Sequence, residues 1–374
     1  MKRYDVDTTA ITPMFNVWGP KRDSKPGLMS VIFDHGEAIG DIEIDRLLYV
    51  YRTGALYEAK RMVIGKGRGA GLTEERVLLK VAHNDAGDQL KKEATLLAKL
   101  QQERQHPMLP VLLPPYQFSD GKQQRAYGKT SVGGDTKYYV VYKQAEGTSL
   151  REMLIKNPQP WYQHAAWITI QLADAIHFIH VKAQTLVMNI NPDGIMIRTD
   201  KDGIPRPLLT DLGTLADPGN MDWEMAKRFI HPSYIAPELL LGVAGAPFGA
   251  QTDVYGLGTL LYEMLMGRPA HPFKLREPED VQTSVLKDMP PPLNRTDLSS
   301  DLPGIVGMAV DKAPARRYPD VRTFAKELRT KFGEVPAERP KRRFPRRVVA
   351  VFVAIVFFLI VWTMLMAFTG ASLG

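Results

Sequence analysis

The feature that most constrains this 374-residue chain is a run of 21 residues without a charge, from Val348 to Phe368. As a helix rising about 1.5 Å per residue, the run would be about 30 Å long, which matches the hydrocarbon thickness of a bilayer. A buried core helix of this length would carry a polar face, and this run shows none. The sequence therefore predicts a single transmembrane helix over residues 348–368, with the rest of the chain outside the bilayer.

Basic residues gather immediately before this run. Between Pro336 and Arg347 there are six basic residues and one acidic residue, so this stretch carries +5 of the chain's net charge of +7. The positive-inside rule then places the N-terminal domain in the cytoplasm and residues 369–374, a short tail, on the other side. We expect residues 332–347 to form a stiff juxtamembrane linker, of which 339–347 bind anionic lipid. Little excess positive charge is left for the folded domain, so nucleic-acid binding is not expected.

The sequence contains no cysteine, which excludes disulfides, thiolate metal sites and cysteine nucleophiles. The histidines, among them His106, His177 and His180, show no metal-ligand spacing, and we interpret them as packing residues. With 44% hydrophobic residues, the chain is long enough for a large domain with its own core. Composition alone does not indicate a function.

Residues 42–331 show strand patterns first and helix patterns later. The expected elements are strands within 42–57, at 77–81, 137–142 and 208–210, and helices at 88–102 and 161–180. From Pro237 onward the pattern is mostly helical. This order predicts an α+β domain with a small β-rich lobe and a larger helical lobe. It is preceded by an N-terminal extension, residues 1–41, to which the sequence assigns no role.

A glycine-rich segment at residues 65–71 invites comparison with a phosphate-binding loop. No Gly-Lys-Ser or Gly-Lys-Thr follows it, so it is not a Walker A loop. Its last glycine lies nine residues before Lys80. The segment is better interpreted as the tip of a hairpin that leads into the strand of that lysine.

Short motifs along residues 42–331 resemble those of the protein kinase family, in the family's own order. They are the lysine motif Val77-Leu-Leu-Lys80, the helix glutamate Glu93, the turn His106-Pro107, the hinge Val140 to Gly147, the metal-binding motif Asp211-Leu-Gly213, the motif Ala236-Pro-Glu238, the helix start Asp253 to Gly258 and the segment Pro314 to Arg317. A single three-residue match arises by chance, whereas eight in order are specific. The resemblance implies a bilobal protein-kinase-like fold. It also implies structural roles for three residues: an ion pair between Glu238 and Arg317, and backbone hydrogen bonds accepted by Asp253.

The catalytic loop departs from the family's pattern. The position of the catalytic Asp, which accepts the proton of the substrate hydroxyl, is Asn189, and an amide has no useful basicity near neutral pH. The lysine position is Asn191, and the position of the Asn that holds a second Mg²⁺ is Gly194. Met188 replaces the arginine that pairs with an activation-loop phosphate. We therefore interpret the chain as a pseudokinase that has lost phosphate transfer.

The resemblance leaves the binding of ATP and Mg²⁺ open. Lys80, Glu93 and Asp211 keep the charges that would orient phosphates, and Asp211 would hold one Mg²⁺. A structural salt bridge would account for Lys80 and Glu93 equally well. The residues that would contact a nucleotide are Gly54, Leu56, Leu78, Lys80, Glu93, Tyr142, Ala145, Met196 and Asp211.

Substitutions at two places argue against an open nucleotide pocket. Tyr49 and Tyr51 stand where the family has the first two glycines of its phosphate-covering loop, so the backbone there cannot approach a phosphate closely. Leu78 replaces the small alanine that covers the adenine ring, and its extra volume points into the pocket.

Three functions stay open at this stage. The first is a membrane-tethered pseudokinase that acts as a signalling or assembly scaffold by binding a cytoplasmic protein through its helical lobe and its activation segment, residues 214–235. The second is an active serine/threonine kinase with a displaced catalytic acid, for which Asp193 is the nearby candidate. The third is another transferase reaction on the same fold, such as nucleotidyl transfer.

Overall fold

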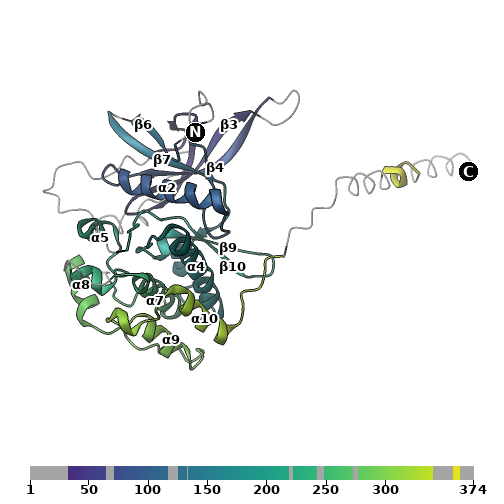
Figure 1. Cartoon of the computed structure of the whole chain (residues 1–374). Coiled ribbons are helices and arrows are strands. Elements are labelled where there is room, and N and C mark those ends of the chain that lie inside the picture. The colour runs from purple at the N-terminus through teal and green to yellow at the C-terminus, as the bar shows by residue number, and fades with distance from the viewer. Residues whose placement is uncertain are drawn as a thin grey trace, which may run out of the picture. The chain divides into compact units, whose positions relative to one another are not determined.

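The structure of the protein is a computed structural model. It describes residues 33–64, 71–116, 125–132, 134–218, 222–241, 248–272, 277–339 and 357–362. The chain divides into two units, residues 1–335 and 336–374. In the first unit a β-rich lobe precedes a helical lobe (Figure 1), which confirms the predicted α+β bilobal arrangement.

Within the described residues, seven strands form the antiparallel sheet of the small lobe, in the order β1-β2-β3-β4-β7-β5, with β6 paired to β7. The strands are β1 (Ala38–Ile39), β2 (Ile42–Val50), β3 (Gly54–Ile64), β4 (Leu72–Ala82), β5 (Leu112–Leu113), β6 (Gly128–Val132) and β7 (Asp135–Lys143). Ile64 pairs with Leu72, so β3 and β4 form the predicted hairpin into the strand of Lys80. The predicted tip at 65–70 lies outside the described residues.

The sheet begins earlier in the chain than the sequence indicated. β1 pairs with β2, and Phe33 is 5% exposed with its ring centroid 6.0 Å from that of Tyr57. The expected domain start at residue 42 therefore divides a hairpin, and the folded domain extends to Phe33. Two-residue β1 is too short to produce a period-two pattern, which explains why the sequence did not reveal it.

Helix α2 (Gly87–Glu103) packs against this sheet (Figure 1). Its apolar residues recur every three or four positions, so they share one helix face. That buried face consists of Leu90, Ala94, Leu96, Leu97 and Leu100, and it also contains Glu93. The helix therefore carries a carboxylate into the interior, toward β4.

The helical lobe is built around α4 (Tyr162–Ala183) and α7 (Ala250–Met266), which are both largely buried. Around them lie α3 (Leu150–Lys156), α5 (Trp223–Phe229), α6 (Pro237–Leu241), α8 (Pro278–Lys287), α9 (Leu302–Ala309) and α10 (Val321–Phe332). Within the described residues, a small second sheet of β8 (Thr148–Ser149), β9 (Ile195–Thr199) and β10 (Pro205–Leu209) frames the catalytic loop and the turn η2 (Pro192–Gly194).

Of the predicted transmembrane run 348–368, only residues 357–362 are described, and they are helical. Among the residues that the structure describes, no helix is both long and apolar enough to cross a membrane. The predicted tail 369–374, the linker residues 340–347 and residues 1–32 of the N-terminal extension lie outside the described part of the chain.

Candidate nucleotide and catalytic site

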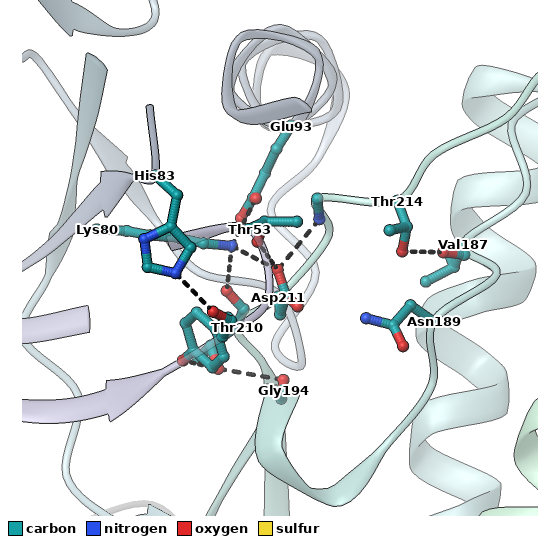
Figure 2. A network of polar contacts seen from close by, with 12 residues as sticks. Thr53, Lys80, His83, Glu93, Val187, Asn189, Gly194, Thr210, Asp211 and Thr214 are labelled. Carbon is teal, nitrogen blue, oxygen red and sulfur yellow. Dashed lines mark hydrogen bonds and ion pairs between the residues drawn. The ribbon is translucent and has the colours of Figure 1, made fainter. Parts of the chain in front are cut away.

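Lys80 lies at the centre of a buried polar cluster between the two lobes (Figure 2). Its Nζ is 2.6 Å from Oε2 of Glu93 and 2.8 Å from Oδ1 of Asp211, and it donates to the carbonyl of Thr210 over 3.3 Å. Strand β4 supplies Lys80, α2 supplies Glu93, and the segment after β10 supplies Asp211. The structure thus brings together three predicted nucleotide-site residues that lie far apart in the sequence.

These three charged groups are withdrawn from solvent. Lys80 and Glu93 are 0% exposed and Asp211 is 2% exposed. Burial alone would lower the pKa of Lys80, but the charges of Asp211 and Glu93 outweigh it and raise that pKa. Burial raises the pKa of Glu93, and the neighbouring Lys80 charge offsets this only in part. The three groups form an ion triad, in which one ammonium group is shared between two carboxylates.

A tight turn between β2 and β3 closes over the triad. The amide of Tyr51 donates to the carbonyl of Gly54 over 2.7 Å. Thr53 Oγ1 donates to Asp211 Oδ1 over 3.0 Å, and the Tyr51 hydroxyl is 2.9 Å from Thr210 Oγ1. The sequence pointed to the tyrosine but not to Thr53, because a threonine in a loop carries no motif.

The apolar residues expected around an adenine ring belong to the continuous core of the domain. The residues of this group that are at most 2% exposed are Leu56, Leu78, Tyr142 and Met196. Ala145 is half-buried and packs against them. The Tyr142 hydroxyl donates to Oε1 of Glu93 over 2.7 Å, so this side chain reaches the ion triad.

The side chains of Asn189 and Asn191 both make hydrogen bonds within the protein at the catalytic loop. Asn189 Oδ1 accepts from Nδ2 of Asn191 over 3.0 Å and from the amide of His231 over 3.2 Å. Asn191 Oδ1 accepts from the amides of Asp193 and Gly194 at 2.9 and 3.3 Å and so caps η2. Figure 2 shows Asn189 apart from the ion triad.

Gly194 leaves no room for a metal-binding side chain. A Cβ added there would lie 2.9 Å from the Cβ of Asp211, closer than real Cβ contacts. The space is therefore filled by Asp211 itself. Across the described ranges, no group of three or more His, Asp or Glu residues is arranged to hold a metal ion.

Asp193, the candidate for a displaced catalytic acid, is held in an ion pair. Arg151 donates to both of its carboxylate oxygens, from Nε over 3.2 Å and from Nη2 over 3.3 Å. Arg151 also donates to Oε1 of Glu263 over 2.5 Å and to the Tyr234 hydroxyl over 3.0 Å, and that hydroxyl donates to Glu263. This network links α3, η2 and α7, and no motif in the sequence indicated it.

Three residues expected to have structural roles make the contacts implied by the resemblance. Glu238 and Arg317 form a two-fold ion pair, with both N–O distances 2.8 Å, and both are buried. Asp253 accepts from the amides of Val187 and Met188 over 2.9 and 2.7 Å.

Comparison with known families matches residues 77–319 to the protein kinase domain. This match covers more than half of the chain, and the chain therefore belongs to the protein kinase family. The match begins at the strand that carries Lys80 and ends just after Arg317, so it includes the ion triad and the catalytic loop.

Curated relatives include several bacterial kinases. Serine/threonine-protein kinase PknB of Mycobacterium tuberculosis is 27% identical over 208 residues, which are 54% of this chain and 32% of that protein. PknB of Mycolicibacterium smegmatis is 29% identical over 209 residues, with the same shares. Serine/threonine-protein kinase PkaA of Streptomyces coelicolor is 31% identical over 125 residues, which are 33% of this chain and 22% of that protein. The chain thus spans about a third or less of the length of these relatives.

Proposed function

We propose that this chain is a membrane-anchored pseudokinase, which has the kinase scaffold, transfers no phosphate and acts by binding a cytoplasmic protein. The observation that carries the proposal is the state of Asn189. Phosphate transfer to a hydroxyl needs a group that accepts its proton. Asn189 is an amide, and its oxygen already accepts from Asn191 and His231.

The alternative, an active serine/threonine kinase, would need another carboxylate in this role. Asp193 is the nearest in sequence, but Arg151 binds both of its oxygens. A carboxylate that is committed to an ion pair would have to lose that pair before it could accept a proton. The names of the bacterial relatives support kinase ancestry, whereas the residues of this catalytic loop favour the pseudokinase.

The packing of the kinase-like domain supports a role in protein binding. Val187, Leu212 and Leu97, which fall where the family stacks a hydrophobic spine, are at most 2% exposed. The ion pair of Glu238 and Arg317 holds the end of the activation segment against the helical lobe. These contacts support a rigid domain that presents its helical lobe and activation segment to a partner.

The membrane part of the proposal rests on the sequence. A run of 21 uncharged residues after six basic residues supports a single spanning helix at 348–368, with the kinase-like domain in the cytoplasm and 339–347 against anionic lipid. Tethering would raise the effective concentration of the domain near membrane partners.

A phosphate-transfer assay on the purified full-length chain in detergent tests the proposal. Labelled ATP is supplied with Mg²⁺ or Mn²⁺, and the acceptors are the chain itself and a general protein substrate. We expect the wild type to transfer no more label than the Asp211→Asn variant. Turnover that is lost in both Asp211→Asn and Asp193→Asn would establish an active kinase with Asp193 as its base. An active kinase of the same family serves as the positive control.

A further inference from the structure

A kinase-like domain that has lost phosphate transfer can still bind ATP. Whether this domain does so depends on the turn between β2 and β3. The kinase family uses the lysine at the position of Lys80 for the phosphates and the aspartate at the position of Asp211 for Mg²⁺. The two groups must therefore be free to meet a ligand. We infer that Tyr51 and Thr53 fill this place permanently, so that the domain keeps its closed site without a nucleotide.

The hydrogen-bond donors of Lys80 are engaged within the protein. An ammonium group has three N–H donors. Those of Lys80 meet Glu93, Asp211 and the carbonyl of Thr210. The Tyr51 ring centroid lies 4.9 Å from Nζ, which is the distance of a cation–π contact. An aromatic face thus stands beside the cation where a phosphate would approach.

One carboxylate oxygen of Asp211 is shared among three donors. Its Oδ1 accepts from Lys80, from the Thr53 hydroxyl and from the amide of Gly213. A bound Mg²⁺ would have to sit about 2.0–2.1 Å from a carboxylate oxygen and bring several waters with it. Asp211 is 2% exposed and Thr53 is 1% exposed, so this hydrated ion has no entry without movement of the turn.

The β2–β3 turn is packed tightly against its neighbours. A Cβ added to Gly213 would lie 2.7 Å from the Thr53 side chain, so that side chain lies directly on the metal-binding motif. A Cβ added to Gly54 would lie 2.2 Å from the carbonyl oxygen of Val81, so this glycine is needed for packing on β4. Arg52 fastens the turn to the activation segment through its 2.6 Å bond to the carbonyl of Ile230.

The residues of this site therefore do not fit ATP with Mg²⁺. The hydroxyls of Tyr51 and Thr53 satisfy Thr210 and Asp211, and the Tyr51 ring covers Lys80. The pairing of Lys80 with Glu93, which aligns α2 with the sheet, is complete without a ligand. The partner-binding form of the domain is for this reason independent of the cellular nucleotide level.

Thermal unfolding of the full-length chain in detergent tests this inference, with Mg·ATP and Mg·tripolyphosphate as probes at millimolar concentration. Tripolyphosphate lacks the adenine ring, so its binding depends on the phosphate site and is insensitive to Leu78. We expect no change in the Tm of the wild type with either probe. The same result is expected for Tyr51→Phe, which removes only a hydroxyl.

The double variant Tyr51→Ala/Thr53→Ala removes both side chains that fill the site. We expect its Tm to rise with Mg·tripolyphosphate, since ligand at ten times its Kd raises the folding equilibrium constant about elevenfold. Tyr49→Ala is the matched control. Tyr49 is the neighbouring half-buried tyrosine, which the sequence also placed beside the phosphates, but the contacts with Thr210 and Lys80 are made by Tyr51, so Tyr49→Ala should give no response. No response in a folded double variant would contradict the role given to the two side chains.

Chemical labelling keeps the inference testable if the double variant does not fold. A water-soluble acetylating reagent should modify surface Lys156 readily and leave Lys80 unmodified in the wild type, as measured by mass spectrometry. A wild-type Tm that rises with ATP and loses this rise in Lys80→Ala would overturn the inference. So would ready acetylation of Lys80 that ATP prevents. Either result would leave the proposed loss of phosphate transfer intact, since binding is not turnover.

Discussion

At the residue scale, the stability of this protein depends on each member of the ion triad Lys80, Glu93 and Asp211. Two carboxylates and one ammonium group are buried together, and each loses its hydration. Such a group is stable only while all members remain, because a single buried charge without its partner is costly. The triad is therefore a point where stability, and not only function, depends on residue identity.

Replacing Lys80 by methionine should destabilise the domain strongly. The side chain keeps most of its volume but leaves Glu93 and Asp211 buried without a cation, so we expect a loss of about 3–5 kcal/mol in the free energy of unfolding. Urea unfolding measures it. Lys156→Met is the control, because Lys156 is exposed and pairs with Glu152 on the surface of α3, where a loss of at most about 1 kcal/mol is expected. Equal losses in the two variants would show that the triad is not stabilising.

His231 should make the stability of the domain depend on pH. Burial, together with the charges of Arg151 and Arg52, holds the pKa of His231 well below its ordinary value of about 6.5. The unfolded chain therefore binds a proton that the folded chain does not, and stability falls as the pH drops below about 6.5, by up to about 1.4 kcal/mol per pH unit from this residue.

Urea unfolding between pH 5 and pH 8 tests this prediction. In the native protein, Nδ1 of His231 accepts from the amide of Ser233 over 3.2 Å. The variant His231→Asn cannot titrate, and its side-chain oxygen can still accept this hydrogen bond. The difference in unfolding free energy between wild type and variant should narrow toward acid pH. A constant difference would mean that His231 keeps an ordinary pKa in the folded chain.

At the scale of elements, the β2–β3 turn and its packing on β4 close the site. The turn is compact because Gly54 lies against the backbone of Val81, and its inward side chains follow from that position. The same glycine in an ATP-binding loop would serve the approach of a phosphate. A methyl group at Gly54 would disturb the fold if the glycine serves packing on Val81, and only phosphate binding if it serves a phosphate.

Gly54→Ala should destabilise the domain even without any nucleotide. The added Cβ would meet a backbone carbonyl oxygen, which cannot rotate away as a side chain can, so we expect a loss of about 1–3 kcal/mol. Gly71→Ala, just before β4, is the control, because nothing lies within 4 Å of the added Cβ and little change is expected. Unfolding by urea gives both values. If the free energy of unfolding of Gly54→Ala equals that of the wild type, packing does not require this glycine, and a role in the approach of a phosphate is favoured.

The sequence predicted the long elements well and the site only in part. Helices α2 and α4 were expected within three residues of their observed bounds, α2 from the period of its apolar residues and α4 from its long apolar run. The strand of Lys80 was expected from the short apolar run 77–81, and it begins five residues earlier, at Leu72, because its first residues are exposed. β1 was missed, since two residues carry no period. Lys80, Glu93 and Asp211 were found through motifs. Thr53 and Arg151 were not, since each acquires its role only through distant partners, Asp211 and Asp193.

At the scale of the whole molecule, the proposal joins an inert kinase-like domain to a membrane. The family match covers residues 77–319, and the basic stretch and the uncharged run follow it in the sequence. A spanning helix holds a protein through burial of apolar area and not through charge, so the attachment should resist salt.

Membrane fractionation tests the anchor. We expect the full-length chain to stay in the membrane pellet in high salt and in alkaline carbonate, whereas a chain that ends at Val335 should move to the supernatant. Replacing the six basic residues of 336–347 by glutamine should leave the full-length chain in the pellet and weaken binding of a 1–347 chain to vesicles with anionic lipid. Release of the full-length chain by salt alone would exclude a spanning helix.

The most direct test of the whole account is a crystal structure of the folded domain grown with an excess of Mg²⁺ and a non-hydrolysable ATP analogue. The account predicts no nucleotide density, the Tyr51 hydroxyl within hydrogen-bond distance of Thr210, and Asn189 bonded to Asn191 and His231. A nucleotide bound at Lys80, with Tyr51 displaced and a carboxylate within about 3 Å of the place of an acceptor hydroxyl, would contradict it.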